Sequence, residues 1–513
     1  MLALVERLRT LETQIRQGGG TAKAEKQHGA GKLTARERID ALKDPDSPFF
    51  ETGLLVAHDR YDGQAPAAGV VTGLTRIERR MCVVVANDAT VKAGAWWPET
   101  IAKILRAQEI AMRNRIPIVY LVDSAGVNLP LQDGIFPGQY GAGRIFYYCS
   151  LMRGKLRIPQ ISAVMGPCIA GGAYLPALSD VIVMVEGVGF MGLGGPHLVK
   201  GATGEVVDAE SLGGAAMHTR TSGVAHFNAS DDHDCLKQIR RLIAAQPEPV
   251  PSPTGKPPAL AAETLYELMP DDQRLPYDTE QVIAALFDSG ELIEFQPGHA
   301  SELICAQTRL MGRPVALLAN RRGFVKTASG PRIGGIIYTE SSRKAAYFVD
   351  YANRNGWPII YLQDVTGFMV GEESEREGII RAGAEMVQAM ACATVPKITL
   401  TLSHASGAGY YAMGGQGFDP NFTLSWPTAR IGVMEGEAAV YASFGTEIEK
   451  HRAMKQELPE NLNERIKKTR ADYEQWLDAI HGAARGHVDA VTDPAETREI
   501  LGFLLEASAR SQP

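Results

Sequence analysis

The sequence predicts an α/β protein made of two similar halves, each with a mostly parallel β-sheet covered by helices. One observation is that short, continuous apolar segments alternate with helix-compatible segments, which is typical of strands buried on both faces of a parallel sheet. A second observation is that the pattern of the first half returns in the second half at offsets of 233, 241 and 237 residues. Recurrence at nearly one offset indicates a duplicated domain.

Composition limits the possible function classes. The 513 residues are 45% hydrophobic and 22% charged, which is ordinary for a globular protein of about two to four domains. A net charge of −7 without a dense Lys/Arg tract argues against nucleic-acid binding. The six cysteines form no C-x-x-C pair, so neither a zinc site nor a disulfide framework is expected. The sequence has no signal-peptide pattern and no membrane-length apolar run, so we expect a cytoplasmic protein.

The elements of the first half follow from local patterns. Helices are expected over 1–45, with a break at 18–20 and a capping box at Thr34 and Glu37. The basic face of that last helix, which includes Arg38, is expected to be solvated or to contact another subunit. The later elements are a hairpin over 69–87, helices over 98–113 and 175–178, and strands over 116–122 and 161–165.

The turn at 167–174 is the first candidate site. Gly171 and Gly172 lie between a strand and a helix, where the backbone can approach a ligand and the first amide groups lack helical acceptors. Such N–H groups stabilise a developing negative charge, including that of an enolate oxygen. Ser124, Ala125 and Gly126 follow the strand over 116–122, so we expect them at the same rim of the sheet.

A long loop at 127–143 follows these residues and carries large side chains, among them Phe136 and Tyr140. Long irregular loops are often lids or binding loops, although a plain surface excursion is the alternative.

A proline-rich stretch at 246–260 predicts a linker, and hence two domains, 1–250 and 251–513. Beyond it, three segments repeat the first half: 318–320 matches 85–87, 357–364 matches 116–123, and Gly409 matches Gly172. The turn at 403–410, after a strand over 397–402, is therefore the counterpart of the first turn. The rest of the chain predicts a charged helical tail over 449–480, a strand over 488–491 and a final helix.

Several segments together resemble one known family, the carboxyltransferase (β) subunits of biotin-dependent acyl-CoA carboxylases. The segments that carry the resemblance are 31–38, 143–147, 171–174, 194–196, 199–205, 212–214, 366–371, 378–384 and 426–429. The wording Thr366-Gly367-Phe368-Met369-Val370-Gly371 is more similar to the 3-methylcrotonyl-CoA and geranyl-CoA branch than to the propionyl-CoA branch. In another segment, Val433-Met434-Glu435-Gly436, Glu435 departs from the family, which has a small residue after this methionine.

The resemblance implies two tandem crotonase-like domains, each a ββα superhelix, with acyl-CoA on 1–250 and biotin on 251–513. It implies transfer of CO2 from carboxybiotin to the enolate of an acyl-CoA, with biotin carried by a partner. The partner would be a biotin carboxylase/biotin carrier (α) subunit, since Ala453-Met454-Lys455-Gln456 is interpreted as helix surface and not as a biotinylation site. A homo-hexamer is implied, in which the N-domain of one subunit faces the C-domain of another. No metal, nucleic acid or membrane is expected.

The resemblance also implies roles for individual residues. Gly171 and Gly172 would form one oxyanion hole, and Ala408 and Gly409 a second one for the ureido oxygen of biotin. The substrate-binding residues would be Ser124, Ala125, Gly126, Phe136, Ala173, Tyr174 and Lys200. The biotin-binding residues would be Gly367, Phe368, Gly407 and Tyr410.

Because a biotin nitrogen can act as the base, no side-chain base is required, and no Ser/His/Asp or paired-carboxylate cluster is expected beside either turn. His404 is expected to be structural. Two alternatives stay open. One is a biotin-dependent decarboxylase component for glutaconyl- or methylmalonyl-type esters, with a membrane partner, and the other is a non-catalytic scaffold.

Overall fold

The computed structural model describes residues 1–246, 253–270, 272–273, 275–290, 292–327 and 330–510. The chain divides into two compact units. The N-terminal unit comprises residues 9–251, and the C-terminal unit comprises residues 252–512 together with 1–8. The predicted boundary between residues 250 and 251, and three of the six prolines of the predicted linker, lie outside the described residues.

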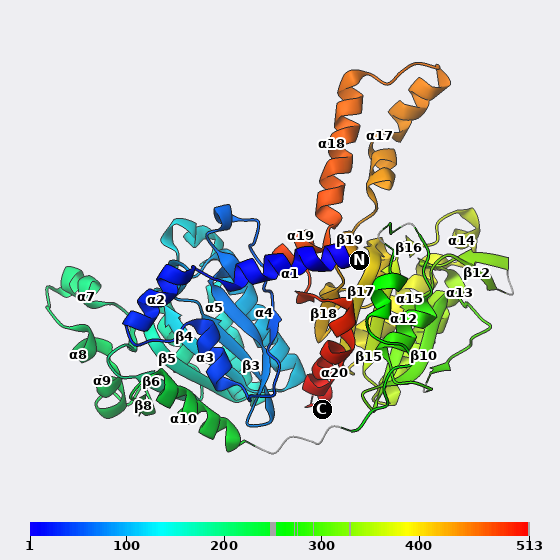
Figure 1. The fold of residues 1–513 in the computed structure, drawn as a ribbon. Coiled ribbons are helices and arrows are strands. Elements are labelled where there is room, and N and C mark those ends of the chain that lie inside the picture. The colour runs from blue at the N-terminus through cyan, green and yellow to red at the C-terminus, as the bar shows by residue number, and fades with distance from the viewer. Residues whose placement is uncertain (247–252, 271, 274, 291, 328–329, 511–513) are drawn as a thin grey trace. The chain divides into compact units, whose positions relative to one another are not determined.

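The N-terminal unit is built on an eight-stranded sheet in the order β1-β2-β3-β4-β5-β6-β8, with β7 paired to β5 (Figure 1). The first three strands pair antiparallel, and β3 to β6, β7 and β8 pair parallel. The strands are β1 (Phe50–Thr52), β2 (Val70–Ile77), β3 (Arg80–Asn87), β4 (Ile118–Ser124), β5 (Gln160–Ile169), β6 (Val181–Val185), β7 (Phe190–Gly192) and β8 (Phe227–Ala229).

The C-terminal unit repeats this topology strand for strand. Its main sheet has the order β9-β10-β11-β15-β17-β18-β20, with β19 paired to β17, and the same change from antiparallel to parallel pairing. These strands are β9 (Ile293–Glu294), β10 (Leu303–Leu310), β11 (Arg313–Asn320), β15 (Ile359–Val365), β17 (Lys397–Ser406), β18 (Phe422–Ser425), β19 (Arg430–Gly432) and β20 (Ala490–Val491). The predicted duplicated α/β fold is therefore confirmed.

Four short strands of the C-terminal unit form two additional pairs. These are β12 (Phe324–Thr327) with β13 (Gly330–Ile333), antiparallel, and β14 (Ile336–Ile337) with β16 (Gly367–Phe368), parallel.

The register of the two sheets is the same at the candidate turns. Strand β4 has an irregularity between Val122 and Ser124, and β15 has one at the matching place, between Gln363 and Val365. Both irregularities surround a buried aspartate, Asp123 or Asp364, whose positions differ by the predicted 241 residues.

Helices cover both faces of the N-terminal sheet. The helices α3 and α10 pack on one face, where their apolar residues join the main hydrophobic cluster. Helix α4 lies on the other face, against β2 and β3, and contacts α5. The helices up to residue 244 are α1 (Leu2–Arg16), α2 (Thr21–Gly29), α3 (Ala35–Leu42), α4 (Pro98–Asn114), α5 (Ala142–Leu151), α6 (Tyr174–Ala177), α7 (Pro196–Thr203), α8 (Ala209–Gly213), α9 (Ala215–Arg220) and α10 (Asp232–Ala244).

In the C-terminal unit, α13 and α15 are the counterparts of α4 and α5, and both pack on the second sheet. The helices of this unit are α11 (Thr264–Leu268), α12 (Thr279–Leu286), α13 (Thr339–Arg354), α14 (Glu372–Glu377), α15 (Ile379–Cys392), α16 (Gly407–Ala412), α17 (Gly436–Ala453), α18 (Glu460–Leu477), α19 (Ala479–Ala484) and α20 (Thr497–Ala507). No helix among the described residues is both long and apolar enough to cross a membrane.

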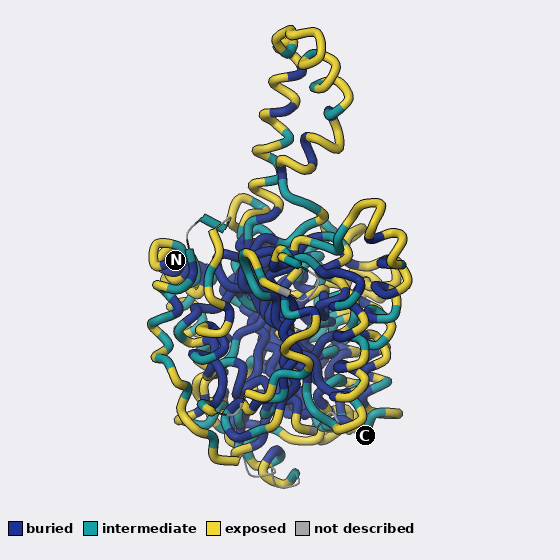
Figure 2. Tube along the Cα trace, turned by 90° about the vertical axis from the view of Figure 1, so that its right-hand side faces the viewer, coloured by how far each residue is buried: buried dark blue, intermediate teal, exposed yellow. Residues whose placement is uncertain are grey.

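The predicted charged tail over 449–480 is mostly helical. Its helices are the end of α17, all of α18 and the start of α19, and α17 and α18 pack against each other as a two-helix arm that projects from the C-terminal unit (Figures 1 and 2). Its surface is largely exposed, and a small apolar cluster that includes Phe444 and Ile466 holds the helices together. Lys455, expected on a helix, instead lies between the helices with a φ of 54°. The left-handed conformation of Lys455 and the proline at position 459 are both incompatible with a continuing helix, so α17 ends at Ala453.

The predicted capping box at Thr34 is present, but the expectation for the basic face of its helix is wrong. Arg38 is only 1% exposed. It donates hydrogen bonds to Asp123 (2.9 Å), Asp232 (2.7 Å) and the carbonyl of Met165 (3.1 Å). Two carboxylates and a carbonyl satisfy the guanidinium inside the unit, which outweighs the preference of arginine for solvent.

Candidate functional site

The first glycine turn begins where β5 ends at Ile169. Ala170 takes a left-handed conformation with a φ of 57°, and a short helical turn then leads into α6. A Cβ atom built on Gly171 or Gly172 would meet no other atom within 4 Å, so both residues face open space. The amides at the start of this helical turn lack helical acceptors, and a ligand atom can approach them without a steric barrier.

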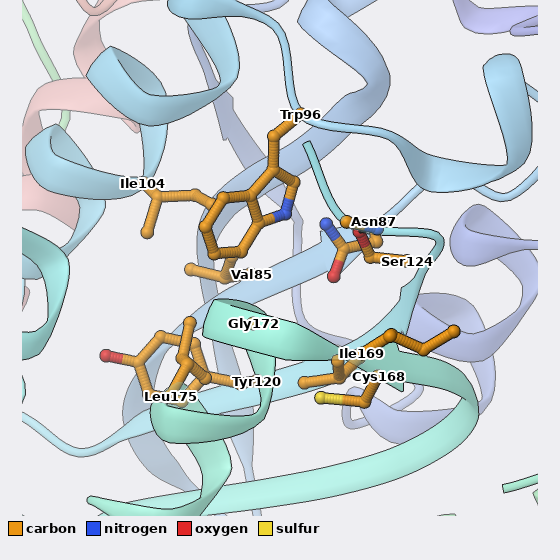
Figure 3. A pocket seen from close by; sticks show the side chains of 12 residues that line it. Val85, Asn87, Trp96, Ile104, Tyr120, Ser124, Cys168, Ile169, Gly172 and Leu175 are labelled. Atoms are coloured by element: carbon orange, nitrogen blue, oxygen red, sulfur yellow. Dashed lines mark hydrogen bonds between the residues drawn. The ribbon is translucent and has the colours of Figure 1, made fainter. Parts of the chain in front are cut away.

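A narrow pocket lies beside Gly172 (Figure 3). Figure 3 shows the indole of Trp96 on one side and the turn at Gly172 on the other, with Asn87 and Ser124 together at one end. The lining residues are Val85, Asn87, Trp96, Ile104, Tyr120, Val122, Ser124, Gly126, Cys168, Ile169, Gly172 and Leu175. Most of this lining is apolar, and its free space of about 10 Å³ is close to that needed by one water molecule.

Cys168 lines this pocket but is not a nucleophile. Burial raises the pKa of its thiol to about 12, so the thiol is protonated at neutral pH, and the thiolate is the reactive form. Burial likewise raises the pKa of Tyr120, whose hydroxyl accepts a hydrogen bond from the Gln108 amide at 3.0 Å. The pocket therefore supplies shape and apolar contact, and the candidate polar groups are backbone amides.

Buried charges hold the end of β4 in place beside the turn. Asp123 binds Arg38 and also Lys32, whose Nζ lies 2.6 Å from its carboxylate. The Ser124 hydroxyl donates to the carbonyl of Gly94 at 2.7 Å and accepts from the amide of Gly126 at 3.1 Å. These bonds fix the strand end that the sequence placed at this rim.

The predicted substrate-binding residues lie at different places. Ser124 and Gly126 line the pocket together with the predicted oxyanion-hole residue Gly172, and Ala173 is buried within the turn. Ala125 and Tyr174 do not line the pocket, although each is adjacent in sequence to a residue that does. Tyr174 is half-exposed. Phe136 is 76% exposed in the loop before α5, and Lys200 is exposed on α7, so neither lines the pocket.

The second turn begins with the same backbone conformation as the first. Gly407, the counterpart of Ala170, has a φ of 56°, and α16 begins there. A Cβ atom on Gly409 would lie 2.6 Å from Cγ2 of Val365 and 3.2 Å from Cα of Gly367, so Gly409 packs tightly where Gly172 faces open space. Strand β16, which contains Gly367 and Phe368, contacts α16, so predicted biotin-side residues do come together.

The other side chains at this turn have distinct partners. The Tyr410 hydroxyl accepts a hydrogen bond from the amide of Gln416 at 3.0 Å, so its contact is structural. Ala408 is exposed. The hydroxyl of Ser406, a residue only 2% exposed, has no hydrogen-bond partner among the described residues. A buried hydroxyl without a partner is costly unless a ligand or water completes it.

A cluster that the sequence analysis did not expect lies beside this turn. The His404 Nδ1 is 3.2 Å from Asp364 Oδ1 and 3.0 Å from the Ser403 hydroxyl. The expectation that no Ser/His/Asp group stands here is therefore wrong. Asp364 and Ser403 share one ring nitrogen, however, whereas a nucleophilic triad places serine and carboxylate on opposite nitrogens. The cluster is not built to activate the serine.

Glu435 also takes part in this neighbourhood. Arg430 donates to Glu435 at 2.8 Å and to Glu474 on α18 at 2.9 Å. Burial disfavours the charged guanidinium, but the two carboxylates outweigh this effect and raise the pKa of Arg430. Glu435 Oε1 lies 3.6 Å from the Nε2 atom of His404.

The sequence analysis missed several residues that the fold brings to the turns. Trp96, Asn87 and Leu175 come to the first pocket from three separate segments. Tyr411 is the counterpart of Tyr174 and is half-exposed like it, a match that the 237-residue offset contained. No group of three or more potential metal ligands occurs within the described part of the chain.

Comparison with known proteins gives the family. The model of the carboxyl transferase domain matches residues 26–512. The chain belongs to this carboxyl transferase family. The carboxyltransferase is 42% identical over 499 residues to the biotin-dependent 3-methylcrotonyl-coenzyme A carboxylase beta1 subunit of Mycobacterium tuberculosis, covering 96% of this chain and 92% of the relative. It is 42% identical over 516 residues to the mitochondrial methylcrotonoyl-CoA carboxylase beta chain of Dictyostelium discoideum, covering 99% and 85%.

Among solved structures, the carboxyltransferase is similar to the β subunit of geranyl-CoA carboxylase from P. aeruginosa. The TM-score is 0.88 at 33% sequence identity, and the match covers 100% of this chain and 93% of that one. The resemblance drawn from the sequence motifs, the fold it implied and the enzyme class are confirmed: this chain is a carboxyltransferase subunit of the biotin-dependent acyl-CoA carboxylase class.

Proposed function

We propose that this carboxyltransferase moves a carboxyl group between biotin at the second turn and an acyl-CoA at the first. The observation that carries the proposal is the pair of turns with one backbone conformation, left-handed at Ala170 and at Gly407, each at the carboxyl end of the equivalent strand. Equivalent turns suit two steps of equivalent chemistry, because each step places negative charge on a carbonyl-type oxygen.

At the first turn, the amides of Gly171 and Gly172 stabilise the enolate of the thioester. Removing a proton from a carbon conjugated with a thioester carbonyl places negative charge on its oxygen, and preorganised N–H donors lower the barrier. The absence of a Cβ at both positions leaves the approach open. Ser124, Ala125, Gly126, Ala173 and Tyr174 shape this side, while Phe136 and Lys200 contact more distant parts of the acyl-CoA.

At the second turn, the amides of Ala408 and Gly409 serve the ureido oxygen of biotin. Biotin, when a partner carries it here, supplies the carboxyl group. Residues Gly367, Phe368, Gly407 and Tyr410 shape the surface around the ring. The buried, unpartnered hydroxyl of Ser406 fits a polar ligand at this place, because a hydrogen bond from that ligand would complete it.

The pocket beside Gly172 favours a short acyl chain. Trp96, Ile104 and Leu175 line it and leave room for about one water molecule, so every acyl chain needs these side chains to move, and a chain of geranyl length needs a larger movement than a short branched chain. Among the short substrates, a 3-methylcrotonyl-type ester is the first choice, in line with the relatives named above.

We assign the biotin to a separate biotin carboxylase/biotin carrier (α) subunit and the core to a homo-hexamer, as the family resemblance implies, in the cytoplasm. No metal is part of the proposal. Light scattering of the purified chain tests the hexamer, and co-purification with the biotinylated subunit tests the partner.

The deciding experiment is a panel of short, branched and long acyl-CoA esters, assayed with ATP, bicarbonate and the biotin-carrying subunit. We expect carboxylation of short branched esters at least about tenfold faster than of geranyl-CoA, a ratio typical of a poorly fitting apolar pocket. No carboxylation of any ester would refute the proposal. Avidin-sensitive release of CO2 from glutaconyl- or methylmalonyl-type esters, without carboxylation, would support the decarboxylase alternative instead.

A further inference from the structure

Among the differences between the two turns, three place ionisable side chains beside the second turn where the first has none. The pairing of β5 with β7 matches Pro167 with Phe190, and the pairing of β17 with β19 matches His404 with Arg430 at the equivalent positions. An apolar pair in the first half is therefore an ionisable pair in the second.

The third difference is the residue before the next helix. Gly195 precedes α7 and Glu435 precedes α17, and both have an extended backbone with φ of −77° and −70°. The same corner thus carries no side chain in the N-terminal unit and a carboxylate in the C-terminal unit.

These residues enclose the imidazole of His404 between two carboxylates. Its Nδ1 faces Asp364 at 3.2 Å, its Nε2 faces Glu435 at 3.6 Å, and its side chain is only 8% exposed. A neutral imidazole has one N–H group and the imidazolium has two, so only the charged ring can donate to both carboxylates. The Ser403 hydroxyl also lies beside this ring, 3.0 Å from Nδ1.

Both carboxylates also have partners of their own. Asp364 binds Arg322 at 3.0 Å and accepts from the Tyr277 hydroxyl at 2.9 Å, and the backbone amide of His404 donates to it at 3.0 Å. Glu435 binds Arg430, which also holds Glu474. His404 is thus the link between two arginine–carboxylate pairs, one from the interior and one from the β19 side.

The link lies against the biotin-side turn. His404 lies on β17, which ends one residue before Gly407, and a Cβ on Gly407 would lie 3.3 Å from the carbonyl oxygen of Val433. The segment that leads to Glu435 therefore borders the turn directly.

We propose that His404 is a positioning residue of the second turn, and that its imidazole, held between Asp364 and Glu435, ties the Glu435 segment to β17 so that the turn keeps its shape for biotin. This inference rests on the proposed function of that turn. Without the imidazole, the Glu435 segment loses its link to β17 and the turn loosens. Affinity for biotin should therefore fall in variants that remove this link, while affinity for acyl-CoA at the first turn should not.

The test measures carboxyl transfer between acyl-CoA and free biotin, with a separate KM for each substrate. The proteins are the wild-type chain, His404→Gln, Glu435→Gln and, as a matched control, His451→Gln on the exposed arm. Losing hydrogen bonds to charged groups predicts a KM for biotin raised about tenfold or more in His404→Gln. We expect the KM for biotin to rise in both network variants while the KM for acyl-CoA stays unchanged, and both KM values to stay unchanged in the control.

Carbon-13 NMR of labelled histidines gives a readout that does not need turnover. The His404 signal, identified by its loss in His404→Gln, should shift in Glu435→Gln, because the neighbouring carboxylate is then lost. An unchanged KM for biotin in His404→Gln, or an equal rise in the KM for acyl-CoA, would overturn the inference. If the wild-type chain transfers no carboxyl group, the proposed function fails, whereas failure of the inference alone leaves transfer intact with an unaltered KM for biotin. Melting temperatures identify any variant that does not fold, and Glu435→Gln then carries the test.

Discussion

The substitutions Gly409→Ala and Gly172→Ala should distinguish a glycine that is needed for packing from one that is needed for catalysis. A methyl group at Gly409 would lie 2.6 Å from Cγ2 of Val365 and 3.2 Å from Cα of Gly367, and one of these neighbours is backbone. Overpacking of this kind costs about 1–3 kcal/mol. For a unit of this size such a loss lowers the melting temperature by about 3–10 °C.

Gly172→Ala is the matched control for stability, because its methyl group would meet no atom within 4 Å and should leave the melting temperature unchanged. The same methyl group stands where the thioester must approach the amides, and loss of one oxyanion donor costs about 10²–10³ in kcat. Scanning fluorimetry and the carboxylation assay measure both effects. Full activity of Gly172→Ala, or an unchanged melting temperature of Gly409→Ala, would refute the reasoning.

Three further predictions concern a buried lysine, the left-handed residues of the two turns and a buried cysteine. Burial lowers the pKa of Lys103 to about 7, so above that pH the unfolded chain binds more protons than the folded one. The free energy of unfolding should therefore rise from pH 7 to 9 by at most about 1.4 kcal/mol per pH unit. Urea unfolding measures this rise, which should be lost in Lys103→Met. Ala170 has a φ of 57°, so Ala170→Gly should raise the free energy of unfolding by up to about 1 kcal/mol in denaturant titrations, and Gly407→Ala should lower it. Cys168→Ala should keep kcat within about threefold, and iodoacetamide should not modify Cys168 in the folded wild type, because its protonated thiol is not the reactive form.

The strands, the duplication and both glycine turns were predictable because their signals are local. An apolar segment that ends in a glycine-rich turn predicts a strand followed by a turn wherever it occurs. The second copy of this pattern lies at nearly the same offset as the other repeated segments, which supports the duplication. The strand matches at Asp123 and Asp364 were also visible in the sequence, and the structure adds that both sit at the same irregularity of the sheet.

The remaining features depend on contacts between distant segments. The pocket wall formed by Trp96 and Leu175 exists only once the sheet brings their loops together. Arg38 was expected in solvent because a charged residue on a polar helix face is usually exposed, and nothing near it in the sequence announces Asp123 and Asp232 as its partners. His404 meets Asp364 across 40 residues because β15 and β17 are neighbours.

The two-helix arm has a mechanical consequence for the biotin-side turn. Its second helix is fastened at Glu474 to Arg430, and the same guanidinium grips Glu435 at the border of that turn. The arm and the turn are therefore held by the same arginine. Bending of the arm must either break the ion pair between Arg430 and Glu474 or move Arg430, and a movement of Arg430 acts on Glu435 beside the turn.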